Sequence, residues 1–401
     1  MKLTLTLALL TALAVPVFAQ EKEPPKTVPA DEELKKGEVP PDRPQFFKLY
    51  PPPNPGTYTP TRPQPSTATR RPDLFAPFPV YSDKRNWLID NTLDIRYTNA
   101  HRGPRGLFLS AARTTLDYII ADKKTGREKG GARVQILAEP DDLGESAIRG
   151  LRASELYGFY VFEFAKTEAN VKLGQFVLPF GLAAVYDTPL QPIQTLYGPS
   201  VGLRVDTGIM VDGSAGPYHY AASLTTGSGP NRRDQAGGVV QSFRLERNFL
   251  TQSGRIQVGG SLLSGKLPVT AYNTELPASG ASSAKDFVDK TRFAADASYY
   301  LKKLTMRGEL QFGADDQRQV WGYFGEGRYG FDEGKSAIAM IRRWNFGQKP
   351  QGVSIYGAGV NFELKNGLTI RTLYEYERAK PSATSSAVVD RRFTIQTRVR
   401  F

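Results

Sequence analysis

The chain has 401 residues and contains no cysteine and only two histidines, His101 and His219. The absence of cysteine excludes a disulfide framework, a thiolate metal site and a cysteine nucleophile. Ser223 follows His219 on the same face of an expected strand, about 13 Å away, which is too far for a catalytic pair. No GxSxG, HExxH or phosphate-binding glycine loop occurs. We therefore predict that the chain is not an enzyme, with no catalytic residues, no metal site and no cofactor.

Long hydrophobic runs are almost absent as well. The mean hydropathy of −0.38 excludes a bundle of membrane helices. The exception is residues 1–19, where Lys2 precedes an apolar run from Leu3 to Val15 and small residues lead to Ala19. This pattern is typical of a secretory signal peptide and is too short for a membrane span. We predict that residues 1–19 are a signal peptide and that the mature chain is exported.

Residues 20–80 lack apolar periodicity and are rich in proline. Pro24-Pro25, Pro40-Pro41 and the run PPPNP over Pro51–Pro55 interrupt this segment. Such a segment cannot bury a hydrophobic core and favours extended, polyproline-like conformations. We predict a disordered Pro-rich segment, either an inert spacer or a tether that binds a partner.

The last stretch of the chain, Val388–Phe401, has the strongest pattern. From Phe393 onward, apolar or small side chains and polar ones alternate strictly, so the strand has one apolar face and one charged face. In a transmembrane β-barrel the apolar faces contact lipid and the polar faces line the lumen. The stretch therefore favours the closing strand of a bacterial outer-membrane barrel over the edge of a soluble β domain. We predict that the terminal aromatic residue, Phe401, is a signal for the barrel-assembly machinery.

Strand-like segments of the same kind fill the chain from about Trp87. Their expected ranges are 87–97, 106–120, 132–139, 155–165, 171–180, 201–211, 217–226, 239–249, 255–264, 292–301, 304–313, 318–329, 335–344, 353–364, 368–378 and the closing strand. An even number of strands is typical of single-chain bacterial barrels. The expected connections alternate between tight turns, such as Asn366-Gly367, and mostly longer loops, such as Gly181–Ser200.

We therefore predict an all-β fold, in which residues 81–401 form a transmembrane antiparallel β-barrel of about 16 strands. Short turns would face the periplasm and long loops the outside. The barrel would then lie in the outer membrane of a Gram-negative-type envelope. The termini and the Pro-rich segment would lie in the periplasm.

One stretch resembles a known family. The segment Gly174–Gly181 reads GQFVLPFG, which resembles a hallmark of the phosphate-selective porin O/P family. The resemblance is clearest over Glu155–Gly229, looser over the rest of the barrel, and does not cover the Pro-rich segment. It implies a sixteen-stranded outer-membrane porin that is usually a homotrimer, a diffusion channel whose third external loop folds inward to narrow the pore.

The loop Gly181–Ser200 has an unusual composition for an external loop. It is apolar, contains three prolines and one acidic residue, and has no lysine or arginine. These properties favour packing against the inside wall, although packing over the rim or on a neighbouring subunit remains open. If the loop narrows the pore, its candidate lining residues are Tyr186, Asp187, Gln191, Gln194 and Tyr197.

The absence of basic residues in this loop argues against a dedicated phosphate site. Acidic and basic residues nearly balance on the expected lumen faces, and the best candidates for anion-facing groups are Arg113, Arg204, Arg244 and Arg371. Positive charge in a narrow aqueous section lowers the barrier to anions. We predict a passive channel for small hydrophilic solutes with a mild anion preference.

The net charge of +12 indicates anionic partners. Since export makes nucleic acid an improbable partner, we expect no nucleic acid but outer-membrane lipid and lipopolysaccharide, together with small hydrophilic or anionic solutes. The alternative function is an outer-membrane structural anchor or adhesin that uses the Pro-rich segment as a periplasmic tether.

Overall fold

The computed structural model describes residues 87–101, 105–121, 128–140, 148–164, 167–185, 195–231, 237–251, 254–268, 287–345, 352–364, 367–379 and 388–400. The predicted signal peptide, the Pro-rich segment and Phe401 lie outside the described residues.

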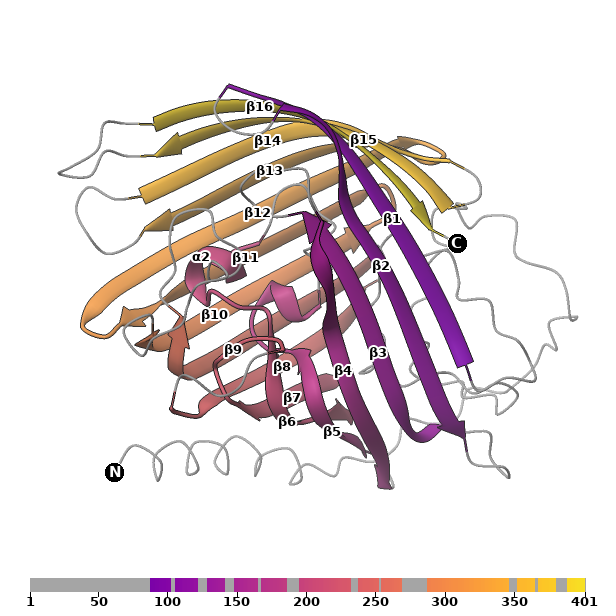
Figure 1. The fold of residues 1–401 in the computed structure, drawn as a ribbon, viewed down its shortest axis with the longest axis vertical. Coiled ribbons are helices and arrows are strands. Elements are labelled where there is room, and N and C mark those ends of the chain that lie inside the picture. The colour runs from indigo at the N-terminus through magenta and orange to yellow at the C-terminus, as the bar shows by residue number, and fades with distance from the viewer. Residues whose placement is uncertain are drawn as a thin grey trace, which may run out of the picture. The chain divides into compact units, whose positions relative to one another are not determined.

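Sixteen antiparallel strands form a closed barrel, which confirms the predicted fold class (Figure 1). The strands are β1 (Trp87–Ala100), β2 (Arg105–Ala121), β3 (Glu128–Pro140), β4 (Ile148–Phe164), β5 (Thr167–Val177), β6 (Val205–Ala215), β7 (Tyr218–Thr225), β8 (Val240–Thr251), β9 (Gly254–Pro268), β10 (Phe287–Leu301), β11 (Leu304–Asp315), β12 (Arg318–Asp332), β13 (Lys335–Asn345), β14 (Gly352–Glu363), β15 (Leu368–Ala379) and β16 (Val388–Arg400). The barrel closes where β1 pairs with β16, from Thr92↔Arg400 to Ala100↔Arg392.

The side chains of each strand alternate between the two surfaces of the barrel wall. Large apolar side chains are exposed on the outside; Ile89 is 59% exposed, Leu173 69% and Leu310 60%. The intervening positions face inward and are mostly polar or charged, as at Asp94 and Arg398. This polarity, apolar outside and polar inside, is that of a barrel surrounded by lipid. Among the described residues, no helix has the length and apolar character needed to cross a bilayer.

The connections differ between the two edges of the barrel. We call the edge with the connections β4–β5, β6–β7, β8–β9, β10–β11, β12–β13 and β14–β15 the turn edge, because each consists of two to four residues. The opposite edge, the loop edge, carries the long connections β5–β6 and β9–β10. Two connections at the loop edge are shorter than this alternation suggests. Residues 101–104 join β1 to β2, and Asp316 and Gln317 alone join β11 to β12, with Asp316 in a left-handed turn conformation (φ 52°).

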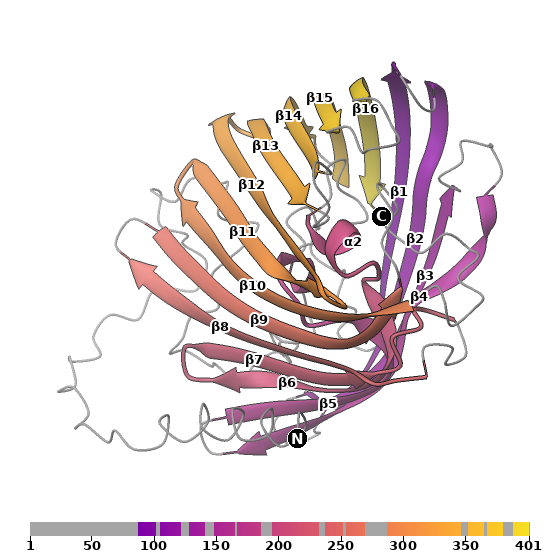
Figure 2. The same cartoon turned by 90° about the vertical axis from the view of Figure 1, so that its left-hand side faces the viewer.

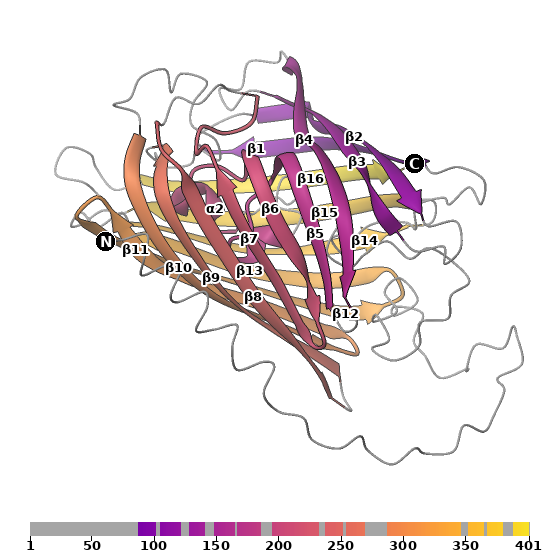
Figure 3. The same cartoon turned by 90° about the horizontal axis from the view of Figure 1, so that it is seen from below.

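Several strands extend beyond their expected ranges toward the loop edge, and the extension is longest for β4 and β10. β4 begins at Ile148 rather than at residue 155, and β10 begins at Phe287 rather than at residue 292. By contrast, β6 begins only at Val205, because residues 201–204 belong to the chain that enters the barrel. That chain includes the 3-10 helix η3 (Leu182–Ala184) and the short helix α2 (Tyr197–Ser200). Figure 2 and Figure 3 show α2 within the ring of strands.

Candidate functional site

The chain between β5 and β6, residues 178–204, enters the barrel and is called here the inward segment. Its two ends meet at the wall, where Val177 pairs with Val205 and the Leu178 N–H donates to the Arg204 carbonyl at 2.9 Å. The described parts are residues 178–185 and 195–204. Four of the predicted lining residues, Tyr186, Asp187, Gln191 and Gln194, lie outside the described residues. The fifth, Tyr197, is in α2 and is only 5% exposed.

Next to the wall, the inward segment packs through an apolar cluster. Leu178 and Phe180 from its first part and Val201 and Leu203 from its last part contact apolar side chains of β8, β9 and β10. These wall residues are Val240, Leu263, Leu267 and Ala294. The inward positions of these strands are thus locally apolar, against the general pattern, because they face protein and not water. Burial of such side chains is worth about 1.5–3 kcal/mol each.

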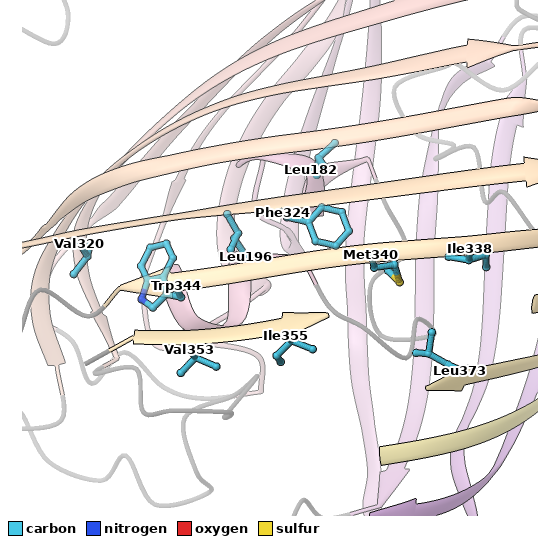
Figure 4. Close-up of a cluster of buried hydrophobic side chains, with 10 residues drawn as sticks. All are labelled: Leu182, Leu196, Val320, Phe324, Ile338, Met340, Trp344, Val353, Ile355 and Leu373. Atoms are coloured by element: carbon cyan, nitrogen blue, oxygen red, sulfur yellow. The ribbon is translucent and has the colours of Figure 1, made fainter. Parts of the chain in front are cut away.

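Farther along, the segment packs against the strands beyond. Leu182 and Leu196 belong to one buried cluster with inward side chains of β12 to β15, and Val185 packs against it. The wall residues are Val320, Phe324, Ile338, Met340, Trp344, Val353, Ile355 and Leu373. Figure 4 shows Leu182 and Leu196 among them. The segment therefore connects the β5–β6 wall with the β12–β15 wall through apolar contacts.

Three hydrogen bonds hold the η3 end of the segment to the wall. The Gly181 N–H donates to Ser261 Oγ at 3.1 Å and the Leu182 N–H donates to Glu309 Oε1 at 2.7 Å. In return, Arg244 Nη1 donates to the Gly181 carbonyl at 3.0 Å. Gly181 has a positive φ of 59°, and a Cβ atom there would lie 2.0 Å from Glu309 Oε1. The backbone conformation of the last glycine of the GQFVLPFG motif is therefore one that favours glycine, and a side chain there would also displace the Glu309 carboxylate.

Two basic side chains of β10 hold the other end. Lys290 Nζ donates to the Val201 carbonyl at 3.1 Å, and Arg292 Nη2 donates to the Ser200 carbonyl at 2.9 Å. Both side chains are fully buried, at 1% and 0% exposure, and Arg292 also forms an ion pair with Asp315. The two cations thus bind the last carbonyls of α2, which lack partners within the helix.

Another residue of the motif connects the base of the segment to strand β4 and to the connection between β7 and β8. Gln175 Nε2 donates to the Ala153 carbonyl at 2.6 Å, and Gln175 Oε1 accepts from the Asn231 N–H at 2.8 Å. One residue on, Phe176 packs with Tyr157 and Met210. The motif that carried the family resemblance is therefore the point where the segment leaves the wall.

Arg244, one of the four predicted anion-facing arginines, has several partners. Its guanidinium forms an ion pair with Asp296, Nη1–Oδ2 at 2.6 Å, and with Glu246, Nη2–Oε2 at 3.0 Å. Arg244 is on β8 and Asp296 is on β10, so the pair crosses β9 above Gly259, where a Cβ would lie 2.6 Å from Arg244 Nη2. Because two carboxylates offset its charge, the geometry gives Arg244 an anchoring role that the sequence prediction did not include.

The other three predicted arginines all face the interior but come from separate parts of the wall. Arg113 is on β2, Arg204 is at the base of the inward segment, and Arg371 is on β15, where its Nε donates to Asn361 Oδ1 at 3.4 Å. They are 8%, 8% and 3% exposed. The structure thus places all four predicted arginines inside the barrel. Arg204 belongs to the inward segment, and Arg244 contacts that segment from the wall.

Most interior charges are matched across strands. Directly opposite residues form several of these ion pairs, and others are diagonal neighbours. They include Asp90–Arg400 at 2.5 Å, Asp94–Arg398 at 3.3 Å, Asp117–Arg133 at 2.6 Å, Lys172–Asp212 at 2.9 Å and Arg307–Glu326 at 2.6 Å. The result is an interior that is strongly polar but locally close to neutral.

Sequence reasoning missed interior basic residues as well. Lys172, Lys290, Arg342 and Arg392 occupy inward positions, and the side chain of Arg392 is 34% exposed, 3.8 Å from Asp390. The signal for Arg392 was present, since it is an even number of residues before Arg398 and Arg400 on the closing strand. For Lys290 no signal was available, because its strand begins five residues earlier than its apolar pattern indicates.

The one residue pair considered for nucleophilic catalysis does not form a catalytic unit. Ser223 Oγ shares a hydrogen bond of 2.7 Å with Ser242 Oγ, and His219 pairs across strands with Glu246. Within the described ranges, no group of three or more histidine, aspartate or glutamate residues could hold a metal ion.

Comparison with known proteins shows the fold. No family model matches the chain, and no curated protein matches it. Among solved structures, an anion-selective porin from Comamonas acidovorans is 11% identical, with a TM-score of 0.55 over 79% of this chain and 100% of its own. OmpT, an outer membrane protein of Vibrio cholerae, gives a TM-score of 0.56 at 10% identity, over 81% and 100%.

The outer membrane channel DcaP of Acinetobacter baumannii is similar to the same degree. Its TM-score is 0.54 at 10% identity, over 80% of this chain and 99% of its own. The chain therefore has the barrel fold of outer-membrane porins. The finer resemblance to the phosphate-selective O/P family rests on the sequence alone, most clearly over Glu155–Gly229 with the motif Gly174–Gly181.

Proposed function

We propose that this protein is an outer-membrane porin, a passive channel for small hydrophilic solutes, and not an enzyme. The observation that carries the proposal is the combination of a closed barrel, a polar interior and a segment held inside it by apolar clusters and hydrogen bonds at both ends. A structural anchor has no need for a rigid segment across a polar interior. In a channel, such a segment sets the narrowest width.

The same geometry supports a mild anion preference. Arg244 is offset by Asp296 and Glu246, so its charge contributes little to the field in the lumen. We assign the anion-facing role to Arg113, Arg204 and Arg371, and we assign to Arg244 the positioning of the inward segment. Because ion pairs neutralise most of the wall, the preference is expected to be modest, without a dedicated phosphate site.

The partners and location follow from this proposal. The protein would be exported by its signal peptide, inserted by the barrel-assembly machinery through a signal at Phe401, and assembled as a homotrimer. A trimer form is described for OmpT of Vibrio cholerae. Membership of the O/P porin family belongs to the proposal too, supported by the GQFVLPFG motif. The Pro-rich segment, residues 20–80, is proposed to be dispensable for conduction.

The test is electrical. The purified full chain is added to a planar lipid bilayer, and stepwise conductance increases are recorded in KCl, followed by the reversal potential in a KCl gradient. The proposal expects open, ohmic steps and a reversal potential displaced slightly to the anion side. A protein that inserts without any conductance would instead be an anchor or adhesin.

A further inference from the structure

The outer face of the barrel carries a group of arginines at the loop edge. On β13, β15 and β16, the charged residues that point outward near this edge are Arg343, Arg378 and Arg391. Arg378 and Arg391 are exposed, and Arg391 lies between the exposed outward residues Val389 and Phe393. We call these three residues the basic edge.

The strand register places the three side chains close together. Arg343 pairs with Ser354, Ser354 with Arg378, and Arg378 with Val389, so all lie in one row across the sheet. Since neighbouring strands are about 4.8 Å apart, Arg343 and Arg378 are separated by about 10 Å. Arg391 is opposite Tyr376, which makes it the diagonal neighbour of Arg378. Long side chains at this spacing can reach one phosphate or two adjacent phosphates.

Among the described residues of the neighbouring strands, no carboxylate on the outer face offsets this charge. The aspartates and glutamates of β13–β16, β1 and β2 within the described residues all occupy inward positions: Asp90, Asp94, Asp117, Glu363, Glu375, Glu377 and Asp390. The sequences of the connections between these strands, residues 102–104, 346–351 and 380–387, contain three basic residues and no aspartate or glutamate. The basic edge therefore carries charge of one sign, without acidic neighbours on the described outer face of these strands.

Aromatic side chains mark the depth of the basic edge. Arg343 lies 5.3 Å from the ring centroid of the exposed Trp321, and the rings of Tyr356 and Tyr376 are 6.4 Å apart one position toward the turn edge. Tryptophan and tyrosine gather where the apolar core of a membrane meets the headgroups. Arg343 lies between the levels of Trp321 and Tyr356, and Arg391 is level with Tyr376, so the three arginines share the band of these rings and are at the level of the headgroups.

We propose that the basic edge binds the phosphates of a phosphorylated lipid in the leaflet at the loop edge. The proposal rests on the outer-membrane location proposed above, where that leaflet contains lipopolysaccharide. Arginine forms two parallel hydrogen bonds with phosphate, and these are stronger away from bulk water. The apolar outer face beside the arginines would contact the acyl chains of the same lipid.

Binding of lipid A to the purified full chain in neutral detergent tests the proposal. The probes are lipid A with two phosphates, the same lipid without phosphates, and inorganic phosphate as competitor. The triple variant Arg343→Gln, Arg378→Gln, Arg391→Gln should bind the phosphorylated lipid about tenfold more weakly or worse. The corresponding triple lysine variant should retain part of the affinity.

Arg247→Gln is the matched control. Arg247 is an exposed arginine near the turn end of β8, and it lies 4.6 Å from the ring centroid of Phe249. Like Arg343 it is an outward arginine beside an aromatic ring, but it lies near the turn edge and not near the loop edge. It should bind like the wild type. Equal binding by the glutamine triple variant, an equal loss in the control, or full competition by millimolar inorganic phosphate would each overturn the proposal.

Conductance separates this proposal from the channel function. The glutamine triple variant should keep the strand content in circular dichroism and the conductance of the wild type, because the three side chains face away from the lumen. A chain that binds the lipid through these arginines but does not conduct would overturn the channel and leave the lipid site standing.

Discussion

Gly259 is the residue that allows Arg244 to reach Asp296. It faces inward on β9, between the two strands that carry the ion pair, and a Cβ there would lie 2.8 Å from Asp296 Oδ1. The next residue, Gly260, faces outward, and a Cβ there would meet nothing closer than the Ala294 carbonyl at 4.0 Å. A side chain at Gly259 would thus collide with the ion pair, whereas a side chain at Gly260 would have room.

Gly259→Ala should therefore displace the paired guanidinium and carboxylate, while Gly260→Ala should not. Replacing a strand glycine by alanine changes stability by only about 0.5–1 kcal/mol, and the displaced ion pair at Gly259 adds to that cost, so Gly259→Ala should be the more destabilising substitution. The measurement is the urea midpoint of unfolding in detergent micelles. A similar small effect of both substitutions would show that the Arg244–Asp296 contact does not contribute to the stability of the barrel.

Glu309 offers a test of the anchor at the η3 end. Its Oε1 accepts the Leu182 N–H at 2.7 Å, and a glutamine carbonyl can accept the same bond. Glu309→Gln should leave single-channel conductance close to that of the wild type. Glu309→Leu removes the acceptor, so we expect a noisier and higher conductance as the segment loses a contact. Identical traces for the two variants would argue that this hydrogen bond does not position the segment.

At the scale of elements, the strands were predictable and the contacts of the inward segment were not. Period-two alternation is local, so Val388–Arg400 could be identified as a strand and its lumen face assigned from the sequence. The anchors depend on register instead. Arg244 and Asp296 are 52 residues apart, and they meet only because β8, β9 and β10 align in one particular way.

The inward segment also explains why strand boundaries were misplaced near it. Residues 201–204 alternate like a strand, and the expected range therefore began at residue 201. In the structure Val201 and Leu203 pack against β8–β10 from inside the barrel. The apolar content of Gly181–Ser200 indicated packing against a wall, but nothing in the sequence could indicate which strands form that wall.

Shortening the inward segment should raise conductance. Replacing residues 183–199 by Gly-Ser-Gly removes α2 and Leu196 while keeping Gly181 and Leu182 at their anchors. The expected result is a larger single-channel conductance together with a lower unfolding midpoint, because the apolar side chains of β12–β15 lose their cover. Removing the same number of residues from the connection 269–286 is the control. Unchanged conductance in the first variant would mean that the narrowest section lies elsewhere.

At the scale of the whole molecule, the balance of interior charge would decide which ions pass through the proposed channel. The chain carries a net charge of +12, yet carboxylates pair with many of its interior arginines, as Asp94 does with Arg398. Pairs of this kind stiffen the wall and leave a small net field in the lumen. The proposed ion preference would then depend on a few groups near the narrowest section and not on the total charge.

Neutralising Arg113, Arg204 and Arg371 to glutamine should shift the reversal potential in a KCl gradient toward cations. Each substitution removes one positive charge from the interior, and at short range in a narrow section the effect on an anion exceeds that of the same charge in bulk water. The shift should shrink in high salt, where the Debye length falls to about 3 Å at 1 M. Arg247→Gln removes one positive charge from the outer face instead, and it should leave the reversal potential unchanged. If the triple variant keeps the reversal potential of the wild type at low salt, then these arginines do not face the ion path, and the more exposed Arg392 is the next residue to neutralise.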